Sequence, residues 1–385
     1  MDGLASDSCD EPSLPSPGCR RSPLVSPPLV HRDVGHNAGG VWVVAGCPTK
    51  RKQRLVSVEA NAESELSVSV VIAAFNVEGA IERAISSLRD QTAPPIEVIV
   101  VDDASTDGTR DVVRRMQTSW PAIRLVELPD NRGPSGARNV GIETASGDWV
   151  AILDADDCFK PDRLEILTRL GEEKNADFVA DNLITFDEAA GVEGGAAFEV
   201  EWQLKCISPF DVIDTSIPEA REFSYGLLKP LLRRTYLNRT GLRYDEATRY
   251  GEDVQFYAEL LFNGARAWVS SQPLYVYTTR VGEISKKSNK YSRSMPRFDL
   301  MAEVNDRFSE KYPDQIDARF RRSLQKRSVR LREIHLANVA RVHRKAGHFW
   351  KYTKCVLTHP GLLRLLLMRT GRRALALAAA TSRRR

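Results

Sequence analysis

Short apolar runs that alternate with segments of helical spacing are the feature that most restricts the fold of this chain. Four such runs span residues 68–75, 96–103, 123–128 and 149–153. They are rich in β-branched residues and are too short for helices, which favours strands. Apolar residues then recur at helical spacing over 80–88, between the first two runs. Strands and helices in short alternating units predict right-handed crossovers and an α/β fold with a largely parallel sheet.

The runs are mostly apolar at successive positions, rather than apolar at every second position. A strand of this kind is buried on both faces, so we expect helices on both sides of the sheet. Another strand is predicted at 178–186, whereas residues 190–220, which Gly and Pro interrupt, are predicted to be irregular. Asn76 follows the first run directly and is predicted to cap the next helix.

The two ends of the chain differ from its middle in composition. Residues 1–65 are rich in Pro and Ser, so we expect a disordered extension. Residues 290–385 carry 24 Lys/Arg against 7 Asp/Glu, a net charge of +17, which leaves −13 for the remainder. We therefore expect a globular domain over 66–289 and a basic helical region over 290–385. A basic arm on an acidic body does not predict nucleic-acid binding; anionic lipid, a polyanion or the body itself is the expected partner.

Carboxylates follow two of the predicted strands at their carboxyl ends, the edge where open parallel sheets bind ligands. Asp103 ends the second run, and Asp154 and Asp156 end the fourth. No histidine lies between residues 37 and 334, and the cysteines are scattered, so a metal there would have oxygen ligands only. Oxygen ligands select Mg²⁺ or Mn²⁺, which commonly bind substrate phosphate as well. The alternative is that each aspartate merely forms a turn or caps a helix.

Five motifs follow one another between residues 67 and 288: VSVVIAAFN, EVIVVDDASTDGT, NRGPSGARNVGI, GDWVAILDADD and RYGEDVQFY. This series resembles the family 2 glycosyltransferases of the GT-A fold. SYGLLKPLLRR and DNLITFDE are most similar to bacterial succinoglycan-type exopolysaccharide glucosyltransferases. The resemblance implies a GT-A (Rossmann-like) domain whose central, largely parallel sheet is flanked by helices. It implies that residues 66–185 bind the nucleotide sugar, and that residues 186–289 bind the acceptor and contain the catalytic base.

The resemblance also implies a nucleotide-binding role for three residues. Phe75 occupies the place where an aromatic side chain stacks on the base, and Ala74 would contact the base through its backbone. Asp103 matches the carboxylate that hydrogen-bonds uracil, while Asp102 is expected to brace the loop. The alternative for Phe75 is a buried side chain at the end of a strand.

The aspartates after the fourth strand match the DxD motif of this family. Asp156 falls where the family places its metal ligand, and Asp154 is its partner in the pair, facing the ribose or the sugar. Asp157 is expected to cap a helix or to support its neighbours, with a direct role as ligand as the alternative. Arg138, which follows the Gly-rich loop, would reach phosphate or donor sugar, or would form a salt bridge with the aspartates. Both readings of Arg138 stay open at this stage.

Glu252 and Asp253 match the motif that carries the catalytic base. An inverting transfer needs one carboxylate on the acceptor side to take the hydroxyl proton during attack on the anomeric carbon. The resemblance assigns that role to Asp253 and an orienting role to Glu252. Taken alone, the pair would also suit the first turn of a helix, where acidic side chains favour the dipole.

These assignments predict an inverting, metal-dependent glycosyltransferase. It would move a hexose, expected to be glucose, from a UDP-sugar to a growing, lipid-linked exopolysaccharide, with Mg²⁺ or Mn²⁺ as cofactor. Two alternatives are a sugar-nucleotide nucleotidyltransferase and a non-catalytic polyanion-binding module. The first usually has a basic residue near the first strand, and AAFNVEGA has none.

Composition and the basic arm predict where the enzyme works. Scattered cysteines indicate reduced thiols, and no secretory signal or apolar run of about 20 residues is evident. We expect a cytoplasmic enzyme, in peripheral contact with the inner face of the cell membrane through the Leu- and Arg-rich residues 359–385. Arg280, Lys286 and Lys287 would close on the diphosphate, or would form a solvated basic loop.

Overall fold

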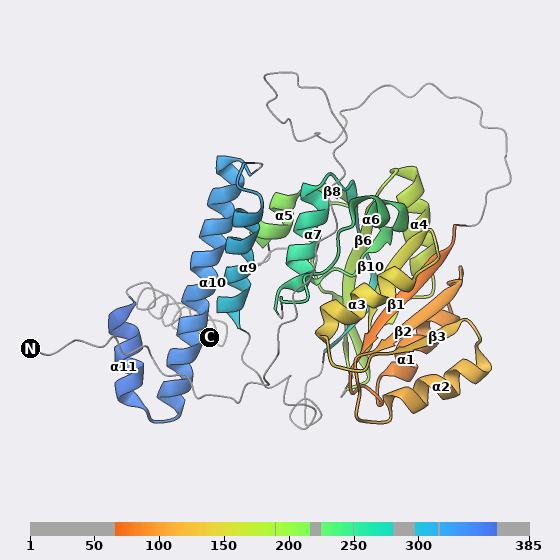
Figure 1. Ribbon diagram of the computed structural model, residues 1–385, viewed down its shortest axis with the longest axis horizontal. Coiled ribbons are helices and arrows are strands. Elements are labelled where there is room, and N and C mark those ends of the chain that lie inside the picture. Colours follow the sequence, from red (N-terminus) through yellow and green to blue (C-terminus); the bar gives the residue numbers. More distant parts are fainter. Residues whose placement is uncertain are drawn as a thin grey trace, which may run out of the picture. The chain divides into compact units, whose positions relative to one another are not determined.

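The computed structural model describes residues 66–188, 190–215, 225–248, 250–279, 297–314 and 316–359. Within them, ten strands form one sheet (Figure 1). The strands are β1 (Val68–Ala74), β2 (Glu97–Asp102), β3 (Ile123–Glu127), β4 (Trp149–Asp154), β5 (Cys158–Phe159), β6 (Phe178–Asp187), β7 (Val192–Ala196), β8 (Leu204–Ile207), β9 (Leu231–Arg233) and β10 (Ala267–Thr279).

Helices pack around this sheet and extend beyond it in the second half of the chain. They are α1 (Ile81–Arg89), α2 (Thr109–Ser119), α3 (Gly133–Thr144), α4 (Arg163–Glu173), α5 (Pro209–Thr215), α6 (Arg234–Thr240), α7 (Glu252–Phe262), α9 (Phe298–Lys311), α10 (Ala318–Lys345) and α11 (Phe349–Thr358), with a 3₁₀ helix η1 at Tyr225–Leu227. The expected basic helices are thus present over the described part of the C-terminal region. The expected extension (1–65) and most of the predicted membrane-contacting arm (359–385) lie outside the described residues.

The sheet runs in the order β3-β2-β1-β4-β9-β6-β10-β5, with β7 paired to β6 and β8 paired to β10. The first four strands of that order are parallel, as the alternating pattern predicts. Strand β9 lies between β4 and β6 and is antiparallel to both, whereas β6 and β10 are parallel. The sheet is therefore parallel where the nucleotide half was predicted and mixed beyond it.

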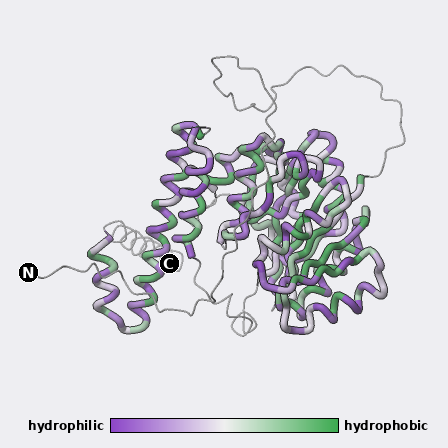
Figure 2. The backbone as a smooth tube through the Cα atoms, viewed as in Figure 1, coloured by the Kyte–Doolittle hydropathy of each residue, from purple (hydrophilic) through white to green (hydrophobic). Residues whose placement is uncertain are grey.

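Both faces of β1, β2 and β4 are buried, as their mostly apolar runs predict, whereas β3 at the edge of the sheet is partly exposed. Alternate residues of one strand enter different cores: Val71 packs with α3, α6 and α7, while Val70 and Ile72 pack with α1, α2 and α4. Figure 2 shows the apolar colour gathered on these strands, with more of the hydrophilic colour along α10. Such two-sided burial is the reason that the strands show no alternation.

Two sequence predictions are wrong in detail. Residues 190–215 are not irregular, since they contain β7, β8 and α5. Asn76 does not cap α1, because that helix begins at Ile81 with Ala80 at its N-cap. Asn76 instead takes a left-handed conformation with φ of 51°, and its side-chain oxygen accepts from the backbone amide of Thr106.

No helix in the described ranges is long and apolar enough to cross a membrane. The cysteines that the structure describes, Cys158, Cys206 and Cys355, are reduced thiols.

Candidate active site

The carboxyl ends of three parallel strands meet at one edge of the sheet. In the register of the sheet, Ala74 of β1 lies beside Asp102 of β2, and Ala73 lies beside Asp154 of β4. The sheet thus brings together the nucleotide-binding residues predicted after β1 and β2 and the aspartates predicted at the end of β4.

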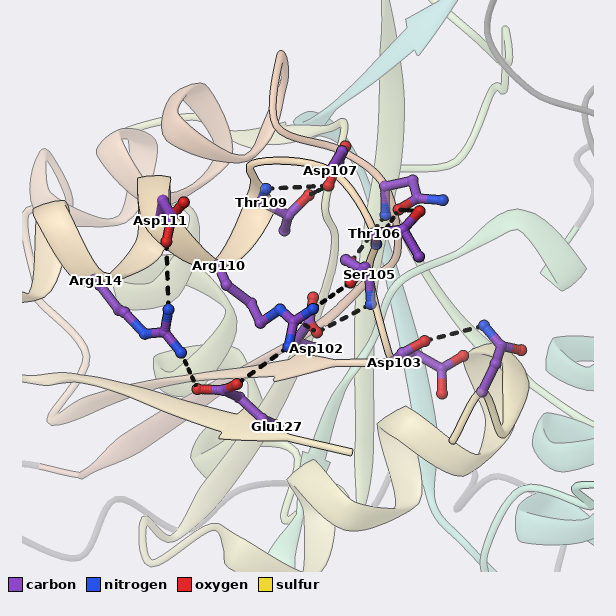
Figure 3. A network of polar contacts seen from close by, with 12 residues as sticks. Asp102, Asp103, Ser105, Thr106, Asp107, Thr109, Arg110, Asp111, Arg114 and Glu127 are labelled. Atoms are coloured by element: carbon purple, nitrogen blue, oxygen red, sulfur yellow. Dashed lines mark hydrogen bonds and ion pairs between the residues drawn. The ribbon is translucent and has the colours of Figure 1, made fainter. Parts of the chain in front are cut away.

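Asp103 holds the start of α3 (Figure 3). Its two carboxylate oxygens accept hydrogen bonds from the backbone amides of Arg132 at 2.7 Å and Gly133 at 2.8 Å. Its own amide donates to the carbonyl of Ala74 at 2.8 Å, so the predicted base contact of Ala74 would have to use other backbone atoms. Asp103 therefore has a structural task, and its contact with uracil stays a prediction.

The loop after β2 is braced by Asp102, which is fully buried. Its carboxylate accepts from the amide of Ser105 at 3.1 Å and lies 3.5 Å from the guanidinium of Arg110. Figure 3 shows this network beside Asp103. Phe75, half-buried at the end of β1, opens the neighbouring loop.

Helix α3 packs closely on the sheet and carries Arg138 to the strand ends. A Cβ atom at Gly141 would lie 2.2 Å from a methyl carbon of Val71, so this approach requires glycine. Arg138 is 5% exposed and donates from Nη2 to Asp154 Oδ1 at 2.8 Å. The salt bridge left open by the sequence is therefore present.

The start of α7 supplies two further carboxylates. Gly251, at φ 78°, precedes the helix in a backbone conformation that favours glycine. Arg138 Nη1 then reaches Asp253 Oδ1 at 3.1 Å and Glu252 Oε1 at 3.4 Å. The predicted base and the predicted donor-side aspartate therefore contact one arginine, although 99 residues separate them in sequence.

Lys229 is a site residue that the sequence analysis did not single out. Its ammonium lies 2.7 Å from Asp253 Oδ2 and 3.0 Å from Asp154 Oδ2. Burial alone would lower the pKa of Lys229, but the Asp154 and Asp253 carboxylates outweigh it and raise that pKa. Burial alone would raise the pKa of Asp154, and here Lys229 and Arg138 outweigh it and lower that pKa. Two cations, Arg138 and Lys229, thus each bridge the carboxylates of Asp154 and Asp253.

A buried ion pair fixes the backbone at Lys229. Arg163 and Asp181 are both almost fully inaccessible, and the guanidinium donates to both carboxylate oxygens at 2.7 to 3.1 Å. The guanidinium also donates to the carbonyl of Lys229 and lies 4.1 Å from the centre of the Phe159 ring. Removing either partner would leave an uncompensated buried charge, so this ion pair and the carbonyl of Lys229 depend on one another.

Asp157 ties the loop after β4 to β10. Its carboxylate accepts from the hydroxyl of Tyr275 at 2.7 Å and from the amide of Thr278 at 2.8 Å. Burial, with the charges of Asp154 and Asp156, raises the pKa of Asp157 to about 8. These contacts are those of a residue that supports its neighbours.

The donor set fits a metal that shares its coordination with a substrate. No group of three or more His, Cys, Asp or Glu in the described part of the chain is arranged to hold an ion alone. Both carboxylate oxygens of Asp154 contact cations, one Arg138 and the other Lys229. Asp156 is half-buried, and its backbone carbonyl accepts a hydrogen bond from Arg83. Mg²⁺ typically takes one or two carboxylates together with waters and substrate phosphates. Asp156, with Asp154 beside it, fits that mode of binding.

Comparison with known proteins agrees with this geometry. Residues 69–208 match the family model for glycosyl transferase family 2. The succinoglycan biosynthesis protein ExoO of Rhizobium meliloti (strain 1021) is 33% identical over 81% of this chain and 87% of its own length. The chain belongs to glycosyl transferase family 2. The predicted family is thereby confirmed, and this membership favours a glycosyltransferase over the two alternatives.

Solved structures support the fold of this family 2 glycosyltransferase. S. aureus TarS 1-349 in complex with UDP-GlcNAc aligns with a TM-score of 0.57 at 21% identity, over 76% of this chain and 80% of that one. The mannosyltransferase PcManGT from Pyrobaculum calidifontis, in complex with GDP-Man and Mn²⁺, aligns with a TM-score of 0.51 at 20% identity, over 84% of each chain. At these identities the likeness shows the fold, and the predicted GT-A fold is confirmed.

One feature of the sequence indicates that Lys229 of this family 2 enzyme is buried and paired. Lysine is seldom buried unless it is paired, and Lys229 stands between Leu228 and the run Pro230-Leu231-Leu232. A charged residue inside a short apolar run is therefore a candidate for a buried ion pair. Arg163 and Asp181 gave no such signal, because their pairing depends on how α4 packs against β6.

Proposed function

We propose that this enzyme is an inverting, metal-dependent hexosyltransferase. It transfers a hexose, which we expect to be glucose, from a UDP-sugar to a growing, lipid-linked exopolysaccharide. The observation that carries the proposal is that Asp154 and Asp253 are held side by side by Arg138 and Lys229. A carboxylate assigned to the donor and one assigned to the acceptor thus border the same space.

Asp253 has the geometry of a base that is oriented before the acceptor arrives. Its Oδ1 accepts from Arg138 and its Oδ2 from Lys229, which fixes the plane of the carboxylate. A carboxylate offers about four acceptor positions, so these two contacts leave room for an acceptor hydroxyl. In the proposed reaction, Asp253 takes the hydroxyl proton as that oxygen attacks the anomeric carbon. The sugar–diphosphate bond breaks on the opposite face, and the configuration inverts.

Glu252 precedes Asp253 in α7, and the negative charges of the two carboxylates repel each other. Burial, with the neighbouring charge of Asp253, raises the pKa of Glu252. Its carboxylate lies 3.4 Å from the guanidinium of Arg138, so it shares that cation with the base. We therefore assign it an orienting role.

Asp156 and Asp154 would hold the Mg²⁺ or Mn²⁺ cofactor, which, when bound, neutralises the charge of the departing diphosphate. Phe75, Ala74 and Asp103 border the space assigned to the base of the nucleotide. Arg138, already bound to Asp154, can stabilise negative charge on the donor without leaving its place. These assignments are part of the proposal and rest on the resemblance as well as on the contacts.

The names of the relatives support the substrate class. ExoO is described as a succinoglycan biosynthesis protein, TarS was crystallised with UDP-GlcNAc, and PcManGT with GDP-Man and Mn²⁺. The polysaccharide acceptor is proposed by similarity to ExoO, the UDP-sugar donor by similarity to TarS, and the metal by similarity to PcManGT. We further propose a cytoplasmic enzyme in peripheral contact with an anionic membrane, in which 66–185 binds donor and 186–289 binds acceptor. The residues predicted to close on the diphosphate, Arg280, Lys286 and Lys287, lie outside the described residues.

A donor screen tests this function. The purified chain is incubated with UDP-glucose, UDP-galactose, UDP-GlcNAc or GDP-mannose, in Mn²⁺, in Mg²⁺ or in a chelator, and the released nucleotide is measured. We expect release from UDP-glucose above the other donors, and its loss in the chelator. Release that is unaffected by the chelator would contradict the metal assignment, and release from GDP-mannose alone would contradict the donor class.

A further inference from the structure

Helix α11 has one apolar face that is already covered. Cys355, 3% exposed, packs with Ala337 and Ala340 of α10, and Tyr352 and Val356 lie half-buried against the same cluster. Figure 1 shows α11 folded back along the end of α10. This face accounts for how α11 is held in place.

A second apolar face of α11 points to solvent. Phe349 is 68% exposed, Trp350 79% and Leu357 76%. At 3.6 residues per turn these side chains fall within an arc of about 100°, opposite the side that carries Cys355. Exposed apolar residues that stand singly need no explanation, but three large ones on a ten-residue helix form a surface that favours a partner. We call Phe349, Trp350 and Leu357 the apolar tip.

Positive charge surrounds the apolar tip. Residues 341–359 contain five Lys/Arg and no Asp or Glu. They are Arg341, Arg344, Lys345, Lys351 and Lys354. At 3.6 residues per turn Lys354, which is half-buried, lies beside Trp350 on α11, and Lys351, which is exposed, lies further round the same helix. The other three are exposed residues in the last turns of α10. A second copy of this chain would bring the same charges against them, so the charge pattern disfavours a symmetric dimer.

We propose that the apolar tip and its five basic residues form a surface that binds anionic lipid bilayers. Aromatic side chains favour the level of the headgroups, where the ring is in contact with apolar chains. Lysine and arginine stems can lie along that surface while their charged ends meet anionic headgroups, at a gain of about fivefold in binding per residue. This inference rests on the lipid-linked acceptor of the proposed function. It assigns the membrane contact to residues that the structure describes, rather than to the arm predicted at 359–385.

Co-sedimentation of the full chain with vesicles tests the surface. The vesicles contain phosphatidylcholine alone, or phosphatidylcholine with phosphatidylglycerol. We expect binding to the anionic vesicles, a loss of at least about tenfold in Phe349→Ser/Trp350→Ser, and a comparable loss in Lys351→Glu/Lys354→Glu. Ile96→Ser, which removes a half-exposed apolar residue before β2, and Arg115→Glu, on the exposed face of α2, should bind as the wild type does.

Several results would overturn the proposal. Wild-type affinity in Phe349→Ser/Trp350→Ser would assign the contact to another part of the chain. Equal binding to both kinds of vesicle would remove the role of charge. A dimer that this variant dissociates, without any vesicle binding by the wild type, would make the tip an interface between copies.

Two measurements separate this inference from folding and from the proposed function. Lipids brominated in the acyl chain should quench tryptophan fluorescence in the wild type and less in Trp350→Phe, which keeps an aromatic ring and should stay folded. Unchanged quenching would place Trp350 outside the bilayer and contradict the proposal. Slow release of UDP in the absence of vesicles should be the same in Phe349→Ser/Trp350→Ser and wild type. Its absence in both would count against the proposed function and leave the vesicle result standing.

Discussion

The ammonium of Lys229 lies 2.7 Å from the carboxylate of Asp253, 24 residues further along the chain. Lys229 precedes β9, a short strand antiparallel to both its neighbours, and Asp253 opens α7. The same ammonium reaches Asp154, so this lysine connects the acceptor half of the site to the donor half. Its position depends on β9, which inserts between β4 and β6.

Replacing Lys229 by methionine should impair both stability and transfer. The change keeps much of the side-chain volume but leaves Asp154 and Asp253 with only Arg138 between them. Breaking a buried ion pair typically costs about 3 kcal/mol of unfolding free energy, and loss of a positioned cation lowers kcat by about 100-fold. Denaturant unfolding and the rate of UDP release with acceptor measure the two effects.

Lys326→Met is the matched control, since Lys326 is an exposed residue of α10 that is distant in sequence from every site residue. It should change neither quantity by more than about twofold in rate or 0.5 kcal/mol in stability. The double variant Lys229→Met/Asp253→Asn should be more stable than the sum of the two single effects predicts, by about 1 to 2 kcal/mol. The reason is that both substitutions remove the same ion pair. Strict additivity would mean that the 2.7 Å contact contributes nothing.

Replacing Asp156 by alanine should abolish metal-dependent binding of UDP. Calorimetric titration of UDP in Mn²⁺ and in chelator should show a difference of at least about tenfold in affinity for the wild type and none for the variant, since the diphosphate then lacks its shared cation. Asp162→Ala, six residues on, is the control, because Asp162 makes no side-chain capping hydrogen bond to α4. A variant that keeps the full effect of Mn²⁺ would exclude Asp156 as the ligand.

Stability should depend on Glu97 in a defined range of acid pH. Burial alone would raise the pKa of Glu97, but hydrogen bonds from Ser146 and Ser69 lower it from 4.5 to about 2. A carboxylate with a lowered pKa stabilises the fold fully above its unfolded pKa, and this contribution is lost as pH falls toward about 2. We expect Glu97→Gln to cost about 2 to 3 kcal/mol at pH 7.

The difference in unfolding free energy between Glu97→Gln and wild type should be constant above pH 5 and should shrink below pH 4.5. Glu165→Gln is its control, since Glu165 pairs with Arg169 at the surface and such pairs contribute less than about 1 kcal/mol. A difference that grows on acidification would contradict the assignment to Glu97.

The parallel half of the sheet could be predicted because its signal is local. β1, β2 and β4 are long enough to show a mostly apolar run, and two-sided burial produces that run directly. Asp103 and Asp154 were then placed at one edge by the rule that parallel strands share their carboxyl ends. Strand β9 has three residues and carries no pattern of its own, so neither its place nor its direction could be derived.

The ion cluster could be predicted only in part. Arg138 and Asp253 were identified through motifs, and the choice between a donor contact and a salt bridge for Arg138 needed coordinates. Lys229 interrupts a short apolar run, which marks it as a candidate for a buried ion pair but does not identify its partners. Arg163 depends on how α4 packs against β6, which no local pattern reports. For Asp103 the motif predicted contact with the nucleotide base. The structure adds a task that the motif did not predict, since its carboxylate accepts two hydrogen bonds from the start of α3.

The central claim, that Asp253 is the base of an inverting transfer, is tested most directly by Asp253→Asn with UDP-glucose and Mn²⁺. Asparagine keeps the shape of the side chain and removes its ability to take a proton. We expect transfer to fall at least about 100-fold while the affinity for UDP stays within about twofold of wild type. Glu252→Gln should lose less. Transfer close to the wild-type rate in Asp253→Asn, or loss of UDP binding together with activity, would contradict the account.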